Sequence, residues 1–97
     1  MRETEFENYL LADENIKSKE KALRSRMTKA RLIERHFSMS LDDIVIDDET
    51  MYRILMQTKA ELKDTNGTIS NALRKYYVFS NGKQFPVLSK FESQRGE

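Results

Sequence analysis

Between residues 3 and 66 the chain contains neither glycine nor proline, the residues that most often break or turn a backbone. Glycine and proline appear only later, at Gly67, Gly82, Pro86 and Gly96. A β fold needs turn residues between its many short strands, whereas helices need them only at their ends. The sequence therefore predicts an all-α fold, and its 97 residues fit one domain.

Apolar spacing predicts four helices, with a fifth if the short connector at residues 40–44 or a C-terminal turn adds one. We expect Ser18 to cap the second helix, Asn66-Gly67 to end the third and Asn81-Gly82 to end the fourth. Residues 1–92 then form one helical domain, and residues 93–97 a disordered tail. The four expected helices cover residues 3–12, 19–37, 48–63 and about 68–80.

The expected second helix is strongly amphipathic. Its apolar residues recur every three or four positions and so form one stripe, and a basic row recurs with the same period on another side. A row of this kind is also common on the solvated face of an ordinary surface helix. The apolar stripe is Leu23, Met27, Ala30, Ile33 and Phe37, and the basic row is Lys21, Arg24, Thr28, Arg31 and Arg35.

Charge alternates in sign along a chain whose net charge is only +1. Residues 17–37 hold eight Lys or Arg against two acids, Glu20 and Glu34, while residues 1–16 and 38–64 are acidic. Like charges three or four positions apart on a helix repel one another, so a row without compensation is mildly destabilising. We infer that this row serves a function. A protein that is nearly neutral overall can still have a basic surface.

The chain has no cysteine, which excludes disulfides and thiolate metal sites. The N-terminus has no apolar run typical of a secretory signal, and the apolar stretches, such as residues 44–46, are far shorter than a membrane span. These features favour a cytoplasmic protein that does not enter a membrane.

No catalytic or cofactor site is predicted. His36 is the only histidine, and the phosphate-loop, nucleophile-elbow and zinc spacings are missing. Residues 42–43 and 47–49 are acidic, and we interpret them as helix caps; a site for a hard cation is the alternative. Tyr76 has the spacing of a core residue, and Tyr77, about 100° further round the helix, has room for partial exposure. We expect both to pack in the fold, and the alternative is a nucleophile or a platform on which bases stack. The sequence therefore favours a protein that binds a partner over an enzyme.

Residues 6–10, 15–19, 41–48 and 69–79, followed by Gly82 and Pro86, resemble the N-terminal core-binding domain of phage integrases and other tyrosine recombinases. The most specific segment is 69–79, with the letters ISNALRKYYVF. This resemblance implies a SAM-like orthogonal helical bundle. The catalytic domain of the recombinases is absent from these 97 residues, so the resemblance implies either part of a longer protein or a relative that cannot cut DNA.

Domains of this family close around duplex DNA through helix faces. The resemblance therefore implies double-stranded DNA as partner, in agreement with the basic row, because Lys and Arg neutralise phosphates. The alternative is a module for protein interaction or self-association, in which the basic second helix contacts an acidic helix of a neighbour. By position, the expected DNA contacts are Lys17, Lys19, Lys21, Arg24, Thr28, Arg31, Arg35, Arg74 and Lys75.

Overall fold

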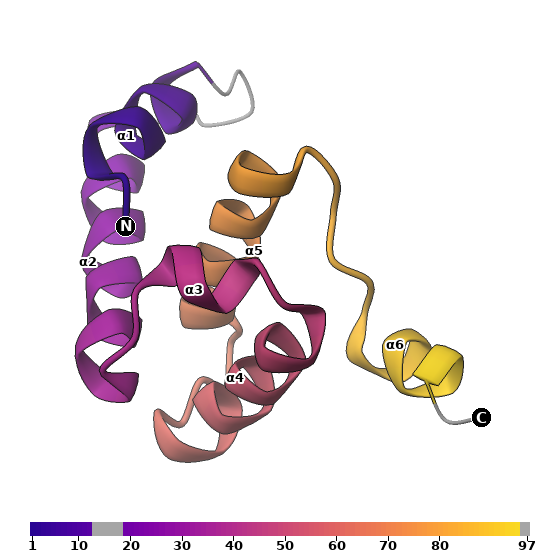
Figure 1. The fold of residues 1–97 in the computed structure, drawn as a ribbon. Coiled ribbons are helices and arrows are strands. Elements are labelled where there is room, and N and C mark those ends of the chain that lie inside the picture. Colours follow the sequence, from indigo (N-terminus) through magenta and orange to yellow (C-terminus); the bar gives the residue numbers. More distant parts are fainter. Residues whose placement is uncertain (13–18, 96–97) are drawn as a thin grey trace.

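All regular structure in the computed structural model, which describes residues 1–12 and 19–95, is helical (Figure 1). This confirms the predicted all-α class. The short connector and the C-terminal segment both form helices, so the described residues contain six helices instead of four or five. They are α1 (Glu3–Leu11), α2 (Lys19–Phe37), α3 (Leu41–Val45), α4 (Asp48–Glu61), α5 (Thr68–Asn81) and α6 (Leu88–Arg95).

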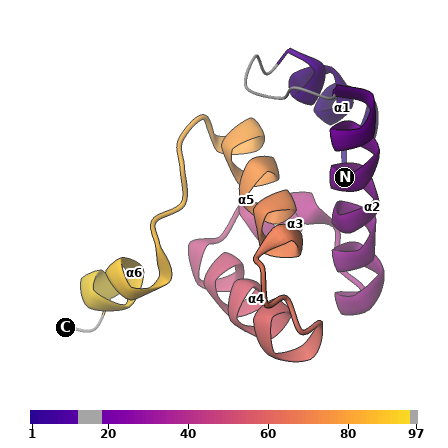
Figure 2. The same cartoon turned by 180° about the vertical axis from the view of Figure 1, so that it is seen from behind.

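Helix α5 lies at the centre and contacts α1, α2, α3 and α4. Its most extensive contact is with α2, the longest helix, which also packs against α1. Helix α6 lies at the end of the molecule away from α2, and both views show α5 between them (Figures 1 and 2). One long face of α2 is therefore left at the edge of the bundle, and this is the face that bears the predicted basic row.

The apolar stripe of α2 packs into the core as its spacing predicts. Met27, Ala30 and Ile33 are buried, while Leu23 and Phe37, at the two ends of the stripe, are half-buried. The expected cap at Ser18 and the expected turn at residues 13–15 lie outside the described residues.

Tyr77 is only 2% exposed, which confirms the expectation that it packs, although its position about 100° round the helix from Tyr76 had left partial exposure open. The chain beyond α5 folds back over it, and its ring meets that of Phe85 edge-on with 5.2 Å between centroids. Its hydroxyl donates a 2.8 Å hydrogen bond to Asp48 Oδ1 at the start of α4. Burial and the adjacent Asp48 carboxylate raise the pKa of Tyr77 to about 12. Tyr77 therefore joins three elements, a role that the period of α5 alone could not reveal.

The link between α4 and α5 is built differently from the expectation. Helix α4 ends at Glu61, and the left-handed residue near its end is Lys63, with φ 52°. Gly67, with φ 75°, instead precedes α5 as its N-cap. The Asp64 side chain lies 6% exposed beneath this turn and accepts hydrogen bonds from the backbone N–H groups of the first turn of α5, at 3.0 and 2.8 Å. Gly67 has no side chain that could accept these bonds, so Asp64, three residues earlier, supplies the side-chain cap of α5.

We expect Asp64→Asn to lower the free energy of unfolding by about 1–2 kcal/mol at pH 7, because one amide oxygen replaces two carboxylate oxygens that accept two N–H bonds. Burial alone would raise the pKa of Asp64, but the hydrogen bonds from Ser70 and Ile69 and the charge of Lys29 outweigh it, so the pKa is lowered. The stabilisation is therefore complete above about pH 4 and is lost as the pH falls through the lowered pKa.

Urea denaturation at pH 7 and at pH 3 measures this effect. The difference between wild type and Asp64→Asn should narrow at the lower pH, because the wild-type carboxyl then begins to protonate. Asp43→Asn is the control, since Asp43 is exposed and should change stability by less than about 0.5 kcal/mol. A destabilisation by Asp64→Asn no greater than that by the control would exclude the capping role.

The C-terminal segment is ordered further than the sequence predicts. Residues 93–95 belong to α6, although we expected a disordered tail from residue 93; residues 96–97 lie outside the described part. The ring of Phe91 lies 5.2 Å from that of Tyr52 on α4 and 5.1 Å from that of Phe85. Aromatic contacts thus attach α6 to the bundle. The local sequence around residue 91 does not show these contacts, because the partners of Phe91 lie on other segments of the chain.

Candidate nucleic-acid interface

The candidate interface is the exposed face of α2 opposite its buried stripe. All five residues of the predicted row are exposed along this helix, and we call the four other than Arg31 the basic face: Lys21, Arg24, Thr28 and Arg35. At a rise of about 1.5 Å per residue, positions 21 to 35 span about 21 Å. The single helix holds these groups on one rigid element.

Arg31, in the middle of the row, is held by an acid of the same chain. Its Nη2 lies 2.7 Å from Glu3 Oε1 and its Nε donates to the same oxygen at 3.2 Å. The hydrogen bond from Arg31 lowers the pKa of Glu3. We expected only Glu20 and Glu34 to be available to neutralise the row, and this was wrong because packing α1 against α2 brings Glu3 to it. Both side chains are about half exposed, so the pair is open to solvent.

The two acids within α2 neutralise little of the basic face. Arg24 approaches Glu20 at 3.5 Å, but the side chains are 79% and 89% exposed, and ion pairs so open to water contribute little. Glu34 turns away from the row: its Oε2 lies 2.9 Å from the amino group of Met1 and accepts a 2.9 Å hydrogen bond from the N–H of Leu41.

Lys21 and Arg35 make no ion pair with any residue that the structure describes. The ends of the row are therefore its most available cations, and the middle is partly compensated.

The other predicted contacts do not join this face. Arg74 points away from α2 and donates hydrogen bonds to the carbonyl oxygens of Phe85 and Pro86, at 3.0 and 3.2 Å. Lys75 is half-buried and already engaged. Lys17 lies outside the described residues, and Lys19 begins α2 but its side chain is not described.

The predicted row omits two basic residues of α2 whose side chains the structure describes. Arg26 is half-buried, with Nη1 3.4 Å from the carbonyl oxygen of Asn71 on α5, and Lys29 donates a 2.8 Å hydrogen bond from Nζ to Ser25 Oγ. Neither falls in the helical period of the row, so the spacing gave no signal for them. Both lie on other sides of the helix, and neither is part of the basic face.

Two of the acidic residues make contacts within the fold. Asp47 is the N-cap of α4, as the capping interpretation predicts, and accepts from the N–H of Thr50 at 3.1 Å. Asp42 is not a cap: it accepts from the Tyr76 hydroxyl at 2.6 Å and from Arg2 Nε at 3.1 Å. Burial would raise the pKa of Asp42, but these bonds and the positive charge nearby lower it. Among the described residues, no group of three acids or histidines is placed to hold a metal ion.

His36 is likewise part of a surface contact. Its Nε2 lies 2.9 Å from Glu61 Oε1 on α4, and its ring meets that of Phe37 edge-on. The contact with Glu61 therefore connects the end of α2 to α4. Neither Glu61 nor Phe37 has a hydroxyl or thiol group that the imidazole could activate as a nucleophile.

Comparison with known proteins finds no matching family model, curated protein or solved structure. In the described part of the chain, no helix has the length and apolar character needed to span a bilayer.

Proposed function

We propose that this chain is a DNA-binding module of the tyrosine-recombinase core-binding type, with the SAM-like bundle of that family and no catalytic residues of its own. The observation that supports this best is the basic face. It places Lys21, Arg24 and Arg35 on one rigid helix at the edge of the bundle, with little compensation from acids of the same chain.

Duplex DNA fits this face in both charge and dimensions. One DNA strand carries a phosphate every 3.4 Å or so along the axis, so a 21 Å row extends along about six of them. Arginine and lysine neutralise phosphates and release counterions, while the Thr28 hydroxyl can donate to a phosphate oxygen. The major groove is wide enough to admit a helix, and arginine can pair with guanine there through two hydrogen bonds.

The proposal assigns a narrower contact set than the resemblance implies. Lys21, Arg24, Thr28 and Arg35 make the contact, and Arg31 joins if a phosphate displaces Glu3 from it. Arg74 is excluded because its guanidinium donates to the carbonyl oxygens of Phe85 and Pro86, in the segment between α5 and α6, and not toward α2.

Affinity for duplex DNA as a function of salt tests the proposal. Three or four cations that neutralise phosphates should give a slope of about −3 to −4 in log affinity against log salt concentration. The affinity should therefore fall about 100-fold between 50 and 200 mM salt. Fluorescence anisotropy with a labelled 20-base-pair duplex measures this slope. A flat response, or no binding at 20 mM salt, would contradict DNA binding.

The alternative is self-association, and sedimentation velocity on the same samples tests it by measuring the oligomeric state. It requires the acidic surface of one copy to meet the basic face of another. Glu3 compensates the middle of the row against both kinds of partner, and we prefer DNA because the resemblance implies it. A salt-sensitive dimer that ignores DNA would reverse this preference.

A further inference from the structure

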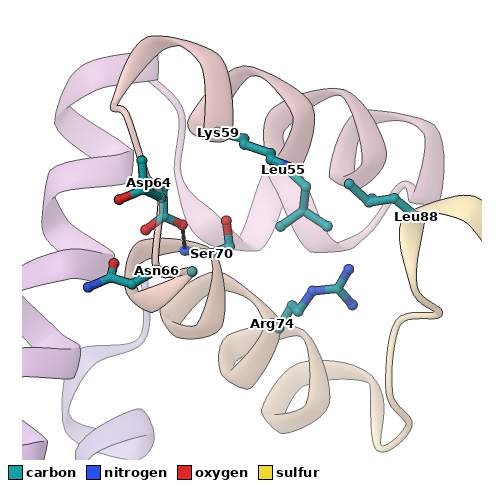
Figure 3. Close-up of a pocket in the computed structure, with 9 residues that line it drawn as sticks. Leu55, Lys59, Asp64, Asn66, Ser70, Arg74 and Leu88 are labelled. Carbon is teal, nitrogen blue, oxygen red and sulfur yellow. Dashed lines mark hydrogen bonds between the residues drawn. The ribbon is translucent and has the colours of Figure 1, made fainter.

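A cavity between α4, α5 and α6 contains positive charge that the DNA-binding proposal does not use. Its volume is about 290 Å³, room for about ten water molecules. No residue of α2 lines it. Figure 3 shows Arg74 on α5 and Lys59 on α4 at its rim, with Leu55 beside Lys59 and Leu88 on the α6 side.

Arg74 is the unusual group in this cavity. It is half-buried, and one nitrogen, Nη1, makes both of its hydrogen bonds, to the Phe85 and Pro86 carbonyl oxygens. No carboxylate of the described residues lies within ion-pair distance of it. Burial lowers the pKa of Arg74, but an arginine stays charged in proteins. The guanidinium lies 5.7 Å from the centroid of the Phe85 ring, and its remaining exposed surface can be reached by an anion from outside.

The one carboxylate in the cavity does not supply that partner. Asp64 lies at the opposite end from Arg74, with Ser70 between them (Figure 3). It accepts the N–H groups of Ile69 and Ser70, and its charge is thereby used to cap α5. Lys59, across the cavity on α4, is exposed and makes no ion pair with a described residue. The lining of the cavity therefore combines two cations with the apolar side chains of Leu55 and Leu88.

We propose that this cavity binds a small organic anion, with its charged group between Arg74 and Lys59 and its apolar part on Leu55 and Leu88. Arg74 keeps Nε and Nη2 available for the anion while Nη1 holds the chain before α6. A phosphate monoester with a short alkyl group has the required chemistry, since arginine pairs with phosphate through two hydrogen bonds. The site is separate from the basic face, so the two proposals stand or fall independently.

The experiment is a titration of the ¹⁵N-labelled protein with n-butyl phosphate at constant ionic strength, followed by amide chemical shifts. We expect saturable shifts at the amides of Leu55, Lys59, Arg74 and Leu88, with millimolar affinity. Inorganic phosphate should shift the same amides but bind more weakly, and n-butanol should have little effect. No saturable shift with n-butyl phosphate, or an equal response to n-butanol, overturns the proposal.

Substitutions of Lys59 and Arg74 test whether these two side chains bind the anion. Lys59→Gln changes an exposed residue, so the protein should fold normally and bind n-butyl phosphate about 3- to 10-fold more weakly. Arg74→Gln should weaken binding at least 10-fold, and Arg74→Lys should restore part of it. Lys83→Gln removes an exposed charge outside the cavity and serves as the matched control. If Lys59→Gln binds as tightly as Lys83→Gln, Lys59 is not a ligand and the proposal fails, whatever Arg74→Gln does to folding.

Discussion

The double variant Arg24→Glu/Arg35→Glu should bind duplex DNA at least 30-fold more weakly than wild type near 100 mM salt. Each substitution removes one cation that meets a phosphate and places an anion beside the DNA backbone. The salt dependence should also become shallower, by about one unit of slope for each phosphate that the variant no longer neutralises. Both side chains are exposed, and Arg24 has only a loose pair with Glu20, so the helical circular dichroism should not change.

The matched control is Lys83→Glu/Lys90→Glu. These lysines are also exposed, the change in net charge is the same, and they lie after α5 and on α6, away from the basic face (Figure 1). A general charge effect would weaken DNA binding equally in both double variants, and that result would contradict a specific role for α2. We leave Arg31 unchanged because Arg31→Glu would set an acid against Glu3 and could alter the packing of α1.

Phe6→Ala should lower the free energy of unfolding by about 3–5 kcal/mol, the range measured for phenylalanines removed from protein cores. Phe6 is fully buried, with ring centroids 4.9 Å from Tyr76 and 5.5 Å from Phe79, and it anchors α1 to α5. A helix of nine residues is not stable alone in water, so α1 depends on this contact. Such a destabilisation is a large part of the stability of a small domain.

Leu11→Ala provides the comparison for Phe6→Ala on the same helix. Leu11 is 42% exposed, and truncating it should cost less than about 1 kcal/mol. Urea denaturation followed by circular dichroism measures both variants against wild type. If the two substitutions have equal effects, Phe6 does not occupy the core position that the structure assigns to it.

The sequence predicts the bounds of some helices better than those of others. The bounds of α2 agree with the expectation because its apolar stripe repeats with the helical period, and the end of α5 agrees because Gly82 takes a left-handed conformation there, with φ 73°. The α4–α5 link was predicted less well. An Asn-Gly pair suits the end of one helix, but the same glycine can begin the next, and only the capping contacts of Asp64 distinguish the two.

The candidate site was predicted in outline only. Helical spacing placed Lys21, Arg24, Thr28 and Arg35 on one exposed face, because a regular helix determines which of its own residues are neighbours. The spacing could not show that Glu3 pairs with Arg31, since the two residues are 28 positions apart and meet only when α1 packs on α2.

The amino-acid sequence by itself determined the all-α class, the amphipathic character of α2 and the basic side of that helix. Those properties depend on contacts between residues a few positions apart. Tertiary structure alone decided that Tyr77 is buried, that Arg74 faces the α6 segment and that Arg31 is neutralised. These outcomes depend on which helices pack together, because burial and charge compensation come from residues that are distant in the chain.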